Sequence, residues 1–194
     1  MVKSNPSSRL LVVDNISPFT KNIMASLDLV KVQYEYKKFY ELPESNRIID
    51  EFCGKVILSG RQVNSKESNA INCSLLRSCF KNNIPILGIC FGCEIIALAF
   101  GGTIVRLKQP ARQMTNVQIL RRNPLVSDSR ALRVFESHVY CIARLPDDFV
   151  RLGSSISCQN EIISHKSKPI FGVQFHPERS GDDGLDLIRR FVEL

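Results

Sequence analysis

The sequence lacks the features that mark several large classes of protein. No run of Lys or Arg exceeds two residues, although 26 basic against 19 acidic residues give a net charge of +7. Scattered positive charge of this kind is typical of a solvated surface, so we do not expect a nucleic-acid partner. We find no internal repeat, low-complexity stretch or linker. With 44% hydrophobic and 23% charged residues, the composition fits one globular domain over 1–194 and excludes a disordered or fibrous chain.

Targeting and membrane segments are also missing. The first eight residues, MVKSNPSS, contain no apolar stretch, so we expect a flexible tail over 1–8 and no signal peptide. The segment 84–102 carries a single charge, that of Glu94, and approaches a membrane span in length. Pro85 and four glycines interrupt this segment. They favour a buried strand, a tight turn and a buried helix, so we expect no membrane association.

The seven cysteines form no recognisable framework. Their number is odd and their spacing irregular, which predicts reduced thiols and a cytoplasmic protein. None pairs with a histidine at the spacing of zinc ligands, so we expect neither a metal nor another cofactor.

Apolar runs and helix-like periods alternate along the first hundred residues. Strands are predicted at 9–14, 32–36, 55–58 and 84–89, and helices at 17–28 (with Ser17 as cap), 65–82 and 92–100. This alternation predicts an α/β fold with a doubly wound, mostly parallel sheet flanked by helices. Strand-like runs at 103–107, 116–121, 131–135, 139–143 and 149–155 predict a small antiparallel extension. A strand at 170–175 and an amphipathic helix at 185–194 complete the fold.

The most informative segment is Gly88-Ile89-Cys90-Phe91-Gly92, which lies between a predicted strand and a predicted helix. A nucleophile at such a turn is exposed above the sheet, and flanking glycines let the strand and helix approach closely. The free N–H groups of the helix start favour a thiolate and can hold a developing oxyanion. Cys90 is therefore the candidate nucleophile, although most single cysteines in such folds are buried structural residues.

A thiol nucleophile needs a base, and the sequence has three histidines. His176 follows an apolar strand directly, as Cys90 does, so both are expected at the carboxyl edge of the sheet. Glu178 lies two residues further on, where its carboxylate can orient the imidazole. His165 has the pattern of a strand-end residue.

These motifs carry a family resemblance that covers essentially the whole chain. GICFG at 88–92 and GVQFHPE at 172–178 resemble a class I (triad) glutamine amidotransferase domain. The stretches 137–149 and 157–166 are most similar to the separate glutaminase subunit of archaeal-type GMP synthase. The resemblance implies that Cys90, His176 and Glu178 form the catalytic triad. It also implies an oxyanion hole from the backbones of Arg61 and Phe91.

Further roles follow from the same resemblance. It places Gly60, Gly92 and Glu94 in substrate binding, and His138 in contact with a partner. Glutamine would be hydrolysed to glutamate through a thioester on Cys90. The chain has no G-x-x-x-x-G-K-[ST] phosphate loop, so we expect ammonia to pass to a separate ATP-dependent synthetase subunit, most simply for GMP synthesis.

Three departures from the family pattern qualify this expectation. Arg61 stands where a glycine normally supplies an oxyanion-hole N–H, and a non-glycine reaches such backbone angles less easily. Cys93-Glu94 replaces the usual His-Gln after the turn. Cys90 and Cys93 also form C-x-x-C, which is the spacing of a redox pair and leads us to hypothesise one here.

These departures keep three alternatives open. In the first alternative, the chain is a class I domain that serves another acceptor, as in anthranilate or aminodeoxychorismate synthesis. In the second, it is a degenerate amidotransferase-like binding protein without activity. In the third, it hydrolyses a small γ-glutamyl compound without any partner.

Overall fold

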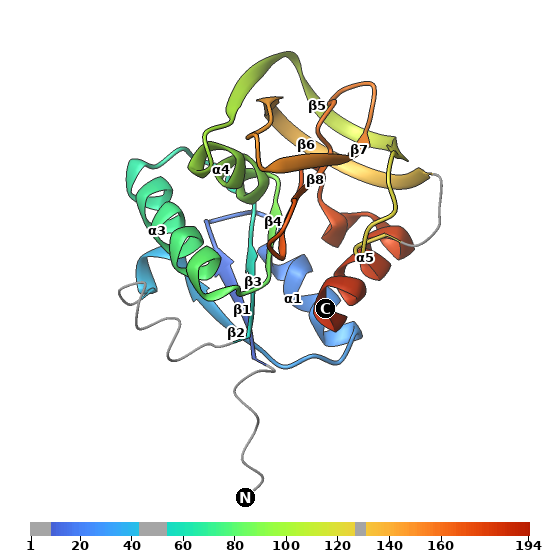
Figure 1. Cartoon of the computed structure of the whole chain (residues 1–194). Helices are drawn as coiled ribbons and strands as arrows, with labels where there is room; N and C mark the ends of the chain where they lie inside the picture. The colour runs from blue at the N-terminus through green and yellow to red at the C-terminus, as the bar shows by residue number, and fades with distance from the viewer. Residues whose placement is uncertain (1–8, 43–53, 127–130) are drawn as a thin grey trace, which may run out of the picture.

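The computed structural model describes residues 9–42, 54–126 and 131–194. The tail predicted over 1–8 lies outside the described residues. Nine strands form one sheet in the order β2-β1-β3-β4-β9-β8-β7-β5-β6 (Figure 1). The strands are β1 (Leu10–Asp14), β2 (Tyr34–Lys38), β3 (Lys55–Leu58), β4 (Ile86–Ile89), β5 (Thr103–Ile119), β6 (Ala131–Arg144), β7 (Phe149–Ser154), β8 (Ile162–His165) and β9 (Ile170–Val173). The helices are α1 (Thr20–Leu29), α3 (Lys66–Asn82), α4 (Phe91–Ala99) and α5 (Gly181–Glu193), with short 3-10 turns η2 (Phe39–Glu41) and η3 (Pro177–Arg179).

The first five strands of that order are parallel, and helices cover both of their faces. In β1, Leu10 and Val12 pack in a core layer with α1 and α5, whereas Leu11 and Val13 pack in the layer beneath α3 and α4. A strand's side chains alternate between faces, so a continuous apolar run is what a sheet buried on both sides requires. The predicted doubly wound α/β architecture is confirmed.

The rest of the sheet is antiparallel and consists of four strands, β8, β7, β5 and β6. The runs predicted at 103–107 and 116–121 are one strand, β5, and those at 131–135 and 139–143 are also one, β6. Pro110 lies in β5 where the β5–β6 register shifts, a position that tolerates a missing N–H. In β6 the apparent break coincides with Glu136 and His138, two polar residues that are buried within the continuous strand.

Two predicted helix starts were wrong. The helix expected from Ser17 begins at Thr20, because the Ser17 N–H donates to Asp14 Oδ1 (3.0 Å) in a turn that precedes it. The C-terminal helix begins at Gly181 instead of 185, directly after η3. Among the described residues, no helix combines the length and apolar character needed to cross a bilayer.

Candidate active site

Cys90 occupies a strained turn between β4 and α4. Its φ of 51° and ψ of −104° are rarely adopted by a residue with a side chain, and such strain is concentrated at functional sites. Glycine is required two residues before and two residues after Cys90, because a side chain at either position would clash with neighbouring backbone atoms. A Cβ on Gly88 would lie 2.4 Å from the Gly92 carbonyl oxygen, and one on Gly92 would lie 2.5 Å from the Leu58 carbonyl oxygen. The turn therefore places Cys90 above the carboxyl end of β4, as the sequence predicts.

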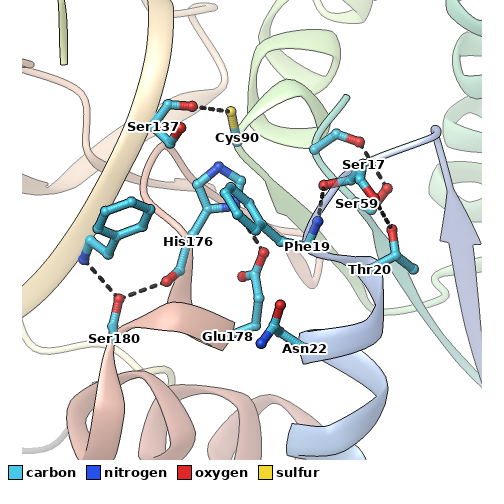
Figure 2. A network of polar contacts seen from close by, with 12 residues as sticks. Ser17, Phe19, Thr20, Asn22, Ser59, Cys90, Ser137, His176, Glu178 and Ser180 are labelled. Atoms are coloured by element: carbon cyan, nitrogen blue, oxygen red, sulfur yellow. Dashed lines mark hydrogen bonds and ion pairs between the residues drawn. The ribbon is translucent and has the colours of Figure 1, made fainter. Parts of the chain in front are cut away.

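His176 is held on several sides at the carboxyl end of β9. Its Nδ1 lies 2.8 Å from Glu178 Oε1, and both side chains are buried (Figure 2). A carboxylate only accepts hydrogen bonds, so Nδ1 carries the proton and Nε2 is left as the basic nitrogen. The His176 backbone pairs with Phe135, its carbonyl accepts from Ser180 Oγ at 2.6 Å, and the Phe19 ring packs edge-on against the imidazole. The imidazole of this candidate base is thus fixed in one tautomer and one orientation.

The surroundings of Gly60 show that the candidate nucleophile Cys90 and the candidate base His176 are neighbours. A Cβ built on Gly60 would lie 3.1 Å from His176 Cε1 and 3.6 Å from Cys90 Cβ. Cys90 and His176 both line a cavity of about 480 Å³, together with Arg61, Phe91, Glu94 and His138. Figure 2 shows the Cys90 sulfur next to the imidazole, with Glu178 on the other side of the ring. The structure thus brings together the sulfur and the imidazole that the sequence separates by 86 positions.

The electrostatic environment of Cys90 favours the neutral thiol over the thiolate. Burial raises the pKa of this thiol well above its ordinary value, and the charges of Glu94 and Glu178 raise it further. A hydrogen bond from the Phe91 backbone and the charge of Arg61 act in the opposite direction but are smaller effects. The thiol also donates a weak hydrogen bond to the Ser137 carbonyl, at 3.9 Å. The helix start does favour the thiolate through the Phe91 N–H, as expected, but burial and the two carboxylates outweigh it.

Arg61 adopts an arrangement that its place in the sequence did not predict. Its guanidinium carbon lies 3.7 Å from the centre of the Phe91 ring, and Nη1 donates to Asn69 Oδ1 at 2.5 Å. Burial lowers the pKa of Arg61, whereas the charge of Glu94 raises it. Because the side chain lies over Phe91 and the residue lines the cavity, Arg61 brings a positive charge to the site.

Glu94 is buried on the first turn of α4, 5% exposed, and faces the same cavity. Burial raises its pKa, and three contacts oppose that effect: a hydrogen bond from Gln174 Nε2 (3.2 Å) and the charges of Arg61 and His138. The Gln174 Oε1 atom has no hydrogen-bond partner among the described residues. Glu94 is thus an acceptor in the wall of the site.

Three predicted site residues lie outside the cavity lining or are buried, and their roles stay predictions. The residues that line the cavity do not include Gly92, which packs against β3, or Gly60, which lies beside His176 and Cys90. His138 is not a surface residue available to a partner. Its side chain is 1% exposed, and its Nδ1 lies 2.8 Å from the Tyr140 carbonyl oxygen.

The two cysteines of the C-x-x-C pair lie in different core layers. Both thiols are free. Cys90 packs in the core layer of α1 and α5, whereas Cys93 packs in the layer beneath α3 and α4. A Cβ on Gly172 would lie 2.6 Å from the Cys93 sulfur, so this sulfur faces β9 and not the turn. The redox pair stays a prediction, which this arrangement of the two side chains does not favour.

Sequence reasoning missed the residues that frame the site from distant segments. The Phe19 ring and the Ser137 carbonyl contact the catalytic pair only through the tertiary fold, so no local pattern could have indicated them. The buried polar run at Glu136 and His138 did leave a signal: it breaks the apolar alternation of β6.

This geometry agrees with comparisons with known proteins. The family model for glutamine amidotransferase class-I matches residues 11–194, so the chain belongs to this family. Within it, the chain is 32% identical over 190 residues to a glutamine-hydrolyzing GMP synthase subunit of Methanocaldococcus jannaschii, covering 95% of this chain and 96% of that protein. The same subunit of Thermococcus kodakarensis is 40% identical over 126 residues, 63% of this chain and 67% of that one.

Solved structures show the same likeness. A putative GMP synthase subunit from Thermoplasma acidophilum superimposes with a TM-score of 0.85 at 31% identity, covering 96% of this chain and 93% of that one. A glutamine amidotransferase from Thermotoga maritima superimposes with a TM-score of 0.75 at 22% identity, over 91% and 78% of the two chains, and supports the fold alone.

Proposed function

We propose that the protein is a glutaminase that releases ammonia from glutamine through a thioester on Cys90. The observation that supports this proposal is that Cys90, whose backbone is strained, lies beside the His176 imidazole, and that Nδ1 of this imidazole lies 2.8 Å from the buried Glu178 carboxylate. A buried thiol with a raised pKa needs a base to take its proton as it attacks, and His176 Nε2 is that base.

In the first half of the reaction, the Cys90 sulfur bonds to the carboxamide carbon while its proton moves to His176. The carbonyl oxygen becomes an oxyanion, which the N–H groups of Phe91 and Arg61 stabilise. Collapse of this intermediate breaks the C–N bond, and the proton on His176 leaves with ammonia. Glu178 stabilises the imidazolium that forms in between.

In the second half, water gives a proton to His176 and attacks the thioester carbon. The C–S bond breaks, glutamate is released, and the proton returns to Cys90. At the other end of the substrate, Glu94 accepts from the α-ammonium group and the Arg61 guanidinium pairs with the α-carboxylate. Two opposite charges in one cavity wall match the two charges of an amino acid.

We further propose that the ammonia passes to a separate ATP-dependent synthetase subunit that makes GMP. The relatives are named as one subunit of GMP synthase, which implies at least one other, and one of them aligns over 95% of this chain. Service to another acceptor is the alternative within the same chemistry. A degenerate binding protein and a partner-independent γ-glutamyl hydrolase are the two other interpretations of the departures at Arg61, Cys93 and Glu94.

Labelling with an electrophilic glutamine analogue tests the chemistry. We expect one adduct, mapped to Cys90 by peptide mass spectrometry. Glutamate release should be lost in Cys90→Ser and kept in Cys93→Ser, a matched thiol that does not line the cavity. Labelling of other cysteines only, or glutamate release that survives Cys90→Ser, would contradict the mechanism.

Adding a purified ATP-dependent GMP synthetase tests the partner. Apo amidotransferase sites often tighten only on assembly, so we expect slow glutamate release by the chain alone and a sharp increase with the synthetase, ATP and xanthylate present. Equal rates with and without it would refute the partner and favour the partner-independent hydrolase. Absence of glutamate release in both states would favour the degenerate binding protein.

A further inference from the structure

A second cluster of ionisable side chains lies beside the candidate active site and takes no part in the proposed chemistry. Glu136 and His138 are two residues apart on β6, so they share one face of the strand. Glu161 comes from the segment just before β8. All three are buried, and one ligand atom from each lies within 4.8 Å of the others.

Several atoms that meet in this cluster make no hydrogen bond. The Tyr140 carbonyl can only accept, so His138 Nδ1 carries a proton and donates it at 2.8 Å. This leaves Nε2, when neutral, with a lone pair on the side of Glu136, whose Oε1 is 3.9 Å away. Nε2, Glu136 Oε2 and Glu161 Oε2 have no hydrogen-bond partner among the described residues.

Two serines hold the outer sides of both carboxylates. Ser157 Oγ donates to Glu136 Oε1 at 2.6 Å, and Ser155 Oγ lies 2.6 Å from Glu161 Oε1. In each carboxylate one oxygen is thus bound to a hydroxyl, and the other is left without a hydrogen bond within the described part of the chain. Hydrogen bonds from a surrounding shell that fix the orientation of a histidine and of carboxylates are characteristic of metal ligands.

We propose that Glu136, His138 and Glu161 bind a divalent first-row transition metal such as Zn²⁺. One imidazole nitrogen and two carboxylate oxygens suit such an ion, and its two charges balance the two carboxylates. Metal–ligand distances of about 2.0–2.2 Å need donors about 3.0–3.6 Å apart. The three side chains therefore need to close by about 1 Å to bind it. This proposal departs from the expectation of no metal, which rested on cysteine and histidine spacing alone.

The ligands' position gives the metal an effect on the active site. Ser137 lies between the two β6 ligands, and its carbonyl is the group that accepts from the Cys90 thiol. His138 also lines the cavity. A metal that joins β6 to the segment before β8 would fix this wall, so the three residues are positioning residues and not catalytic ones.

Metal titration of the full chain tests the site. Cys90→Ser is the host, so that the nucleophile does not itself capture metal. After chelation and buffer exchange, calorimetry with Zn²⁺ should show one equivalent bound. Glu136→Gln and Glu161→Gln, which keep the side-chain shape, should each weaken binding at least about 10–100-fold. Asp14→Asn, a buried carboxylate outside the cluster, should leave it unchanged.

X-ray absorption at the zinc edge, on protein without the Glu or Asp substitutions, gives a readout independent of how the variants fold. We expect a first shell of nitrogen and oxygen with one imidazole. A shell dominated by sulfur, or the absence of stoichiometric binding, would overturn the proposal. So would binding that survives both glutamate substitutions. If stoichiometric binding is absent, or if binding survives both glutamate substitutions, we would conclude that the three side chains share protons instead of a metal. None of these outcomes bears on glutamate release, so the two proposals fail independently.

Discussion

Replacing Glu94 by Gln is the most informative single change in the site. Glu94 raises the pKa of the Cys90 thiol through its negative charge, whereas an uncharged amide of the same shape does not. The carbonyl of the introduced amide can still accept the bond that Gln174 Nε2 donates at 3.2 Å. Its NH₂ group can also serve Gln174 Oε1, which has no partner among the described residues. The substitution therefore removes a charge without leaving a buried group unpaired.

The magnitude follows from the position of the two residues, one helical turn apart. Side chains at this spacing are about 6 Å apart, and at an effective dielectric constant of about 20 two unit charges then interact by about 3 kcal/mol. Arg61 lies close to both groups and cancels part of this effect. We take about 1–2 kcal/mol as the remainder, which corresponds to about a 5- to 30-fold larger thiolate fraction at a given pH.

Alkylation kinetics can measure this difference directly. We expect iodoacetamide to modify Cys90 about 5- to 30-fold faster in Glu94→Gln, as followed by mass spectrometry of the peptide that contains it. The gain should disappear at low pH, where the Glu94 carboxyl is itself protonated, and its raised pKa extends that range upward. Glu67→Gln, an exposed carboxylate on α3, is the matched control. An unchanged or slower rate in Glu94→Gln would refute this electrostatic reasoning.

Three further predictions concern the base, the turn and the core. Glu178→Gln should lower kcat for glutamate release about 10²–10⁴-fold with little change in KM. The substitution disturbs the tautomer of the His176 imidazole, whereas Glu178 itself does not line the cavity. A change confined to KM would contradict this prediction. Gly88→Ala should lower the free energy of unfolding by about 1–3 kcal/mol or more through its 2.4 Å backbone clash. Gly101→Ala is the comparison, because a Cβ there meets open space but the backbone has a φ of +90°; it should lower the free energy of unfolding by about 1–2 kcal/mol. A smaller loss for Gly88→Ala than for Gly101→Ala in denaturant melts would count against the packing argument. Burial lowers the pKa of His165 below 6.5, and the neighbouring charges of Lys168 and Lys166 lower it further. Its stabilisation is therefore present above pH 6.5 and lost as pH falls, so melting temperatures of His165→Gln should depend less on pH in this range; parallel profiles would contradict it.

Much of the fold followed from local chemistry in the sequence. The apolar runs of β1, β3 and β4 are continuous because helices bury both faces of the sheet, and this pattern is readable without coordinates. The two glycines around Cys90 indicated the strained turn, and the backbone contacts that they allow explain why no side chain fits there. Interruptions within the strands were the main source of error: Pro110, which lacks an N–H, and the buried polar Glu136 made two long strands resemble four short ones.

The proposed triad could be predicted from the sequence, because Cys90 and His176 each follow a parallel strand and Glu178 lies two residues beyond His176. Tertiary structure decided the charges around it. Burial, Glu94 and Glu178 outweigh the helix start at Cys90, and the Arg61 guanidinium lies over Phe91. Tertiary structure alone also brought Glu161 to two residues of β6. Electrostatic effects depend on distance and desolvation between segments remote in the chain, and neither quantity is encoded in spacing along it.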